Sequence, residues 1–126
     1  STAFTIGDSG RVNTNTHKYI ALLFASVDGI SKVGSYDGAD SAQTITTGFQ
    51  PRFLIIKKIN GTYSWWVLDT TRGWGSGNES YLQLNSHAAQ ATDFNFGAPT
   101  SNGFTLDSVS DSMNISGGKY IYYAHA

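Results

Sequence analysis

The sequence contains no cysteine, only two prolines and one methionine, and charged residues make up just 13% of its 126 positions. Without cysteine, a disulfide framework and a zinc site built on thiolates are both excluded. The net charge is −1 with no basic cluster, which argues against capture of nucleic acid or of an anionic membrane surface. No apolar run is long enough to span a bilayer as a helix. The sequence therefore predicts no nucleic-acid partner and no membrane insertion.

Helical periodicity is almost absent as well. The best helical segment, Ser86 to Ala91, is too short to be stable alone. Hydrophobic residues (40%) and aromatic residues (13%) are too frequent for a disordered chain, and the length suits one domain with a real core. The fold class predicted is therefore all-β, an antiparallel, jelly-roll-like β-sandwich with at most one short helix.

Strand-like runs recur between clusters of turn residues such as Asp28-Gly29, Asn60-Gly61 and Gly117-Gly118. The expected strands are Ala3 to Ile6, Lys18 to Ala25, Ser31 to Tyr36, Gln43 to Thr47, Arg52 to Ile59, Thr62 to Asp69, Ser80 to Leu84, Phe104 to Asp107, Ser112 to Ile115 and Lys119 to Ala124.

The densest apolar run lies on either side of Asn60-Gly61. This dipeptide favours a two-residue type I′ hairpin, because both central residues of that turn need positive φ. Such a turn would pair Ile55 with Trp66 and place Trp65 on the opposite face. A longer loop, such as Asn60 to Tyr63, would shift the register and exchange the two faces.

An internal repeat joins the two ends of the chain. Its matches are Phe4-Thr5-Ile6 with Phe104-Thr105-Leu106, Val12-Asn13 with Met113-Asn114, Lys18-Tyr19-Ile20 with Lys119-Tyr120-Ile121, and Ala25 with Ala126. In one interpretation, residues 1–25 are N-terminal strands that resemble the end of a preceding module, and residues 26–126 form the β-sandwich module. In the other, the two similar strands pair side by side in one sheet. Because the chain begins with Ser1, a longer or processed polypeptide is expected.

No arrangement of catalytic residues is evident. Gly7-Asp8-Ser9-Gly10 is similar to a serine-protease nucleophile loop, but no histidine precedes it. Nine carboxylates, with Glu79 the single glutamate, are scattered along the chain, and no spacing among them indicates the carboxylate pair of a glycosidase. The three histidines, His17, His87 and His125, lack the spacing of metal ligands. We therefore expect no enzyme activity, no cofactor and no metal.

Two loops carry the residue types that recognise a sugar, namely aromatic rings beside carboxylate, hydroxyl and amide groups. The predicted ligand-binding residues are Trp74, Ser76, Asn78, Tyr36, Asp37 and Asp40. Trp74 lies among glycines and either folds back as a lid over the sandwich or is displayed as a stacking platform. Asp37 and Asp40 could bind Ca²⁺, although two carboxylates in a glycine turn are more typical of an Asx-turn.

Short segments in a fixed order carry a family resemblance. They are Tyr19 to Ala25, Val33-Gly34-Ser35-Tyr36-Asp37-Gly38, Gly48 to Lys57, Trp66 to Gly73, Tyr81-Leu82-Gln83-Leu84-Asn85, Gly103-Phe104-Thr105 and Gly117 to Tyr122. Over roughly residues 19–126, the chain resembles a small β-rich module of tailed-bacteriophage tail fibres and related virion structural proteins.

The resemblance implies a homotrimeric tail fibre domain that attaches the virion to a host-cell surface glycan, with a bacterial surface polysaccharide and other virion proteins as partners. The alternative is a purely structural or trimerisation module of a virion appendage without ligand binding. The resemblance assigns no binding residues.

Overall fold

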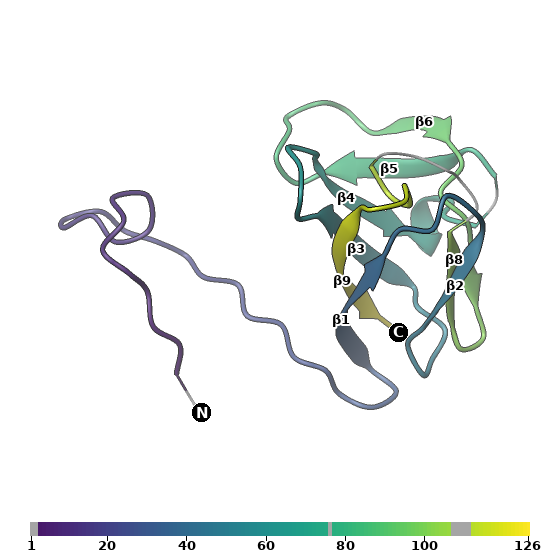
Figure 1. The fold of residues 1–126 in the computed structure, drawn as a ribbon, viewed down its shortest axis with the longest axis horizontal. Coiled ribbons are helices and arrows are strands. Elements are labelled where there is room, and N and C mark those ends of the chain that lie inside the picture. Colours follow the sequence, from purple (N-terminus) through teal and green to yellow (C-terminus); the bar gives the residue numbers. More distant parts are fainter. Residues whose placement is uncertain (1–2, 76, 107–111) are drawn as a thin grey trace.

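The computed structural model describes residues 3–75, 77–106 and 112–126. Two antiparallel sheets pack face to face, and an extended N-terminal arm, residues 3–26, leads away from them (Figure 1). The predicted all-β sandwich is confirmed. One turn of 3-10 helix, η1 (Thr70–Arg72), is the helical element of the described residues.

The larger sheet has six strands and the smaller has three. In spatial order the larger sheet contains β1 (Ser31–Asp37), β9 (Lys119–His125), β3 (Phe53–Lys58), β4 (Trp65–Asp69), β5 (Glu79–Gln83) and β6 (Ala91–Phe94). The smaller sheet contains β2 (Gln43–Thr46), β8 (Gly103–Leu106) and β7 (Pro99–Thr100). The last strand of the chain, β9, is therefore an interior strand between β1 and β3.

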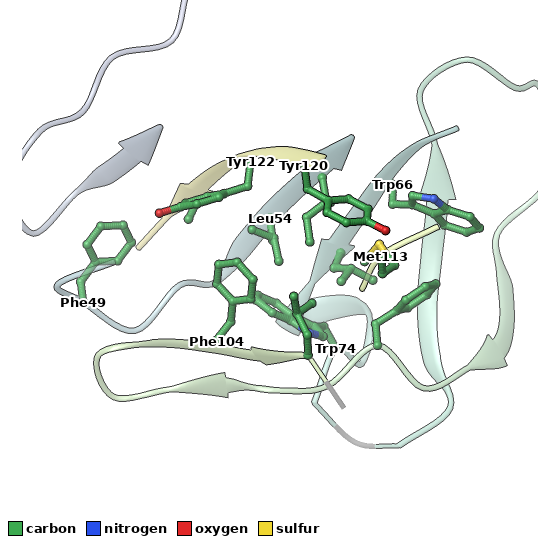
Figure 2. Close-up of a cluster of buried hydrophobic side chains, with 13 residues drawn as sticks. Phe49, Leu54, Trp66, Trp74, Phe104, Met113, Tyr120 and Tyr122 are labelled. Atoms are coloured by element: carbon green, nitrogen blue, oxygen red, sulfur yellow. The ribbon is translucent and has the colours of Figure 1, made fainter. Parts of the chain in front are cut away.

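The core forms between the sheets, because alternate residues of each strand point to the same face. On β9, Tyr120, Tyr122 and Ala124 are buried, and β8 contributes Phe104 and Leu106 from the opposite sheet. Figure 2 shows these rings interleaved with residues of β3 and β4. The buried cluster consists of Phe49, Leu54, Ile56, Trp66, Leu68, Trp74, Phe96, Phe104, Leu106, Met113, Tyr120, Tyr122 and Ala124.

The β3–β4 hairpin forms, but the two-residue register predicted for it is wrong. Ile56 pairs with Trp66, and the connecting loop spans residues 59–64. Neither Asn60 nor Gly61 adopts positive φ. Asn60 instead serves a tertiary contact: its Oδ1 accepts from Lys119 N at 2.8 Å and its Nδ2 donates to Gly117 O at 2.8 Å. These contacts stabilise the longer loop.

The expected opposition of the two tryptophans is confirmed, since Trp66 is 8% exposed and Trp65 is 40% exposed. Trp66 packs against Tyr81, Phe94 and Phe96, with ring centroids 4.9, 6.4 and 5.2 Å away. The shifted register changes the β3 residue that pairs with Trp66 from Ile55 to Ile56, but Trp66 remains in the core.

Several predicted elements do not form. Ala3 to Ile6 and Lys18 to Ala25 lie in the arm and are not strands, and Ser112 to Ile115 is a series of turns around buried Met113. Ser86 to Ala91 is not helical, and β6 and β7 are short strands that the sequence did not predict. Side-by-side pairing of the two repeat strands is also wrong, because the neighbours of β9 are β1 and β3.

Within the described residues, no helix is both long enough and apolar enough to cross a membrane.

Candidate functional site

The first predicted loop has a structural role. The Tyr36 hydroxyl donates to Met113 O at 2.7 Å, and its ring stacks on Tyr120 with centroids 4.8 Å apart. Asp37 pairs with Lys119 at 3.0 Å in solvent, and Asp40 Oδ1 accepts from Ser116 N at 3.0 Å. Tyr36 and Asp37 lie at the end of β1, and these contacts tie them and Asp40 to the start of β9 and to the segment that precedes it.

The second predicted loop folds back onto the sandwich. Trp74 is 4% exposed, its Nε1 donates to Gly97 O at 3.0 Å, and it packs on Phe104 (Figure 2). Positive φ at Gly73 (106°) and Gly75 (94°) turns the chain so that the indole enters the core. The displayed-platform interpretation is therefore wrong, and the lid interpretation is confirmed. Asn78 is exposed, and Ser76 lies outside the described residues.

No hydrogen bond, ion pair or ring contact between described residues joins Trp74 or Asn78 to Tyr36, Asp37 or Asp40. The described residues of the two predicted loops are therefore not joined to one another by polar or ring contacts. In the part of the chain that the structure describes, no three histidine or acidic side chains gather in a way that could hold a metal ion.

The partly buried Tyr36 predicts a loss of stability in alkali. Burial raises the pKa of its hydroxyl above the ordinary value, and the neighbouring Tyr120 raises it further. The fold holds the neutral phenol, so this stabilisation is fully present below about pH 10 and falls as the pH rises toward the folded-state pKa. Urea titrations should show a steeper alkaline decline in the free energy of unfolding for the native chain than for Tyr36→Phe. Equal alkaline slopes for the native chain and Tyr36→Phe would contradict this prediction.

The outer face of the larger sheet, which points away from the smaller sheet, carries an apolar groove of about 620 Å³. The floor is formed by side chains that alternate with the core residues, including Val33 on β1, Ile55 on β3 and Ile121 on β9. Trp65 and Leu84 complete this face, and Leu22 and Phe24 of the arm form the opposite wall.

Contacts at the root of the arm hold this wall in place. The ring of Phe24 lies 4.4 Å from that of Tyr123, centroid to centroid. Ser26 Oγ accepts from Val33 N at 3.0 Å, and Ser31 Oγ donates to Ala25 O at 2.8 Å. The groove is therefore a space between the sheet and the arm.

The groove offers apolar surface and few free polar groups. Val33, Trp65 and Leu84 are 43%, 40% and 61% exposed. Asn85, the one amide in the lining, already accepts from Trp65 N at 2.9 Å through its Oδ1. Contiguous exposed apolar surface of this kind marks an interaction site, and its chemistry suits apolar side chains of a partner. The signal in the sequence was the dense apolar run on either side of Asn60-Gly61, which supplies Ile55 and Trp65.

The fold and the groove together define a β-sandwich domain with an exposed apolar outer face. The chain belongs to the family described as a domain of unknown function, DUF7483, whose model matches residues 1–126. This match includes the arm as well as the sandwich. Comparisons with curated proteins and with solved structures gave no match.

Proposed function

We propose that this domain is a structural module of a virion appendage such as a tail fibre, and that the groove holds a neighbouring protein subunit. The observation that carries the proposal is the apolar groove on the outer sheet face, where Val33, Ile121 and Trp65 are partly exposed. The virion setting is supported by the resemblance of residues 19–126 to tail fibre modules.

The partner proposed is another copy of the chain in a homotrimer. Three copies about one axis would each present the same face, and burial of that face would remove exposed apolar surface from water. A chain with 13% charged residues has few surface charges to keep its copies apart.

Attachment to a bacterial surface polysaccharide is the second candidate, favoured by Trp65. Its side chain is 40% exposed at the groove and could stack on the apolar face of a sugar ring. Trp65 takes the stacking role that the sequence had given to Trp74. Three copies on one axis would raise the avidity of such a weak site.

Charging the groove should dissociate the assembly. For the double substitution Val33→Asp and Ile121→Asp, we expect roughly hundredfold weaker self-association, because an unpaired charge buried in an interface costs several kcal/mol. Light scattering and sedimentation equilibrium would measure the strength of self-association. The matched control is Ile59→Asp, an exposed apolar residue (54%) outside the groove lining.

A native chain that stays a 13.6 kDa monomer at every concentration would count against the trimer. Binding to a glycan array that is lost in Trp65→Ala, with the mass in solution unchanged, would favour attachment instead.

A further inference from the structure

The arm contains the same turn as the segment that leads into β9. In the arm, His17 N donates to Thr14 O at 3.3 Å. At the matching positions of the repeat, Gly118 N donates to Ile115 O at 2.9 Å. The arm has this conformation although its described residues, 3–26, contain no strand.

Two further features of this turn are the same in the arm and in the segment before β9. The Tyr19 hydroxyl accepts from Thr14 N at 2.9 Å, and the matching Tyr120 hydroxyl accepts from Ile115 N at 3.1 Å. The residue at the third position of the turn has positive φ in both copies, 72° at Thr16 and 75° at Gly117. Threonine adopts positive φ rarely, so the turn itself, and not the preference of its residue, sets this conformation. The repeat is therefore present in the three-dimensional structure as well as in the amino-acid sequence.

The segments that follow the two turns can also be compared position by position. On β9 the buried residues are Tyr120, Tyr122 and Ala124, and their counterparts in the arm are Tyr19, Ala21 and Leu23. The outward residues Ile121, Tyr123 and His125 correspond to Ile20, Leu22 and Phe24. Of these pairs, Leu22 and its counterpart Tyr123 both line the groove. Tyr19 and Leu23, at the positions of buried β9 residues, are 47% and 75% exposed in the arm and could enter a core.

We propose that the arm supplies the last two strands, the counterparts of β8 and β9, to a second β-sandwich of this fold. Phe4-Thr5-Ile6 would take the place of Phe104-Thr105-Leu106 in β8, and Lys18 to Ala25 the place of β9. The family model spans the arm together with the sandwich, so the arm is a regular part of this domain family.

The second sandwich has a different core from this one. Here a Cβ on Gly34 would lie 2.5–2.6 Å from the Tyr122 ring, which shows that the ring fills the space over β1. The arm has Ala21 at that position and would leave a void. It also has Leu23 where Ala124 is fully buried, which would overfill the core.

A third mismatch lies at the start of β8. A Cβ on Gly103 would lie 2.0 Å from Ile45 O, and the arm has Ala3 at this position. The arm therefore fits a sandwich with a larger residue opposite Ala21 and a smaller one opposite Leu23, and exchange with the β9 of another copy of this chain is disfavoured.

The test extends the full chain at its N-terminus with a second copy of residues 27–102, joined directly to residue 3. Three substitutions relieve the three mismatches: Ala3→Gly and Leu23→Ala in the arm, and Gly34→Val in the extension. The arm then follows the extension as β8 and β9 follow residue 102 in the native order. We expect the extension to fold on the arm, so that the protease-resistant mass rises roughly twofold and the arm amides become protected from hydrogen exchange. Tyr19→Ser should abolish both effects, while the matched outward change Ile20→Ser should leave them.

The substitution Gly34→Val gives a second readout. We expect it to shift the thermal midpoint in opposite directions in the extension and in the native sandwich. In the extension, where Ala21 would face it, the larger side chain should fill the void and raise the thermal midpoint. In the native sandwich it would collide with Tyr122 and lower the midpoint.

An extension that stays protease-sensitive in every variant would overturn the proposal. A native, unextended chain that forms a dimer with a protected arm would also overturn it, because the arm would then be exchanging with β9 of an identical copy. Neither readout uses the groove substitutions Val33→Asp and Ile121→Asp, so this inference can fail while the proposed function stands.

Discussion

Replacing Trp74 with alanine is expected to lower the free energy of unfolding by about 3–5 kcal/mol, the range for a large aromatic residue removed from a core. The side chain is 4% exposed and lies between the sheets against Phe104 (Figure 2). The substitution also leaves Gly97 O without the indole N–H that it accepts at 3.0 Å. Urea denaturation followed by fluorescence would measure the loss.

The matched control is Trp65→Ala. Trp65 is 40% exposed on the outer face, and its removal should cost about 1 kcal/mol or less, as for surface residues in general. Equal losses in the two variants would show that Trp74 does not belong to the core. A Trp74→Ala domain of native stability would restore the displayed-platform interpretation that the structure rejects.

Replacing Asn114 with alanine is expected to lower the free energy of unfolding by about 3 kcal/mol, because three hydrogen bonds of this buried side chain would be lost at once. Asn114 is fully buried; its Oδ1 accepts from Ala39 N at 3.1 Å and also from Gln43 Nε2, and its Nδ2 donates to Ser41 O at 2.8 Å. This one side chain fastens the β1–β2 connection to the segment before β9.

The repeat provides an unusually close control for this prediction. Asn13 is the counterpart of Asn114, but it is exposed in the arm and donates to Gly7 O at 2.9 Å. Asn13→Ala should change the free energy of unfolding by less than about 0.5 kcal/mol. A similar loss in both variants would mean that the amide acts locally within its turn and not through the buried network.

The candidate site was harder to predict than the fold class. Tyr36, Asp37 and Asp40 have the chemistry that a sugar needs, yet each is used by a contact within the fold. The groove depends on which residues of β1, β3, β4 and β9 share an outer face, and those strands are far apart in the sequence. Local patterns record which residue types are present, but they do not record which strands become neighbours.

The sequence by itself determined the all-β class, because apolar residues recur at strand spacing between turn residues and helical spacing is almost absent. It also determined that Trp65 and Trp66 face opposite sides, since neighbouring strand residues always do. Only the tertiary structure decided the hairpin register, because Asn60 bonds to Lys119 and Gly117 instead of forming a tight turn. It also decided the place of Trp74, since glycines on both sides allow either burial or display and the contacts with Gly97 and Phe104 select burial.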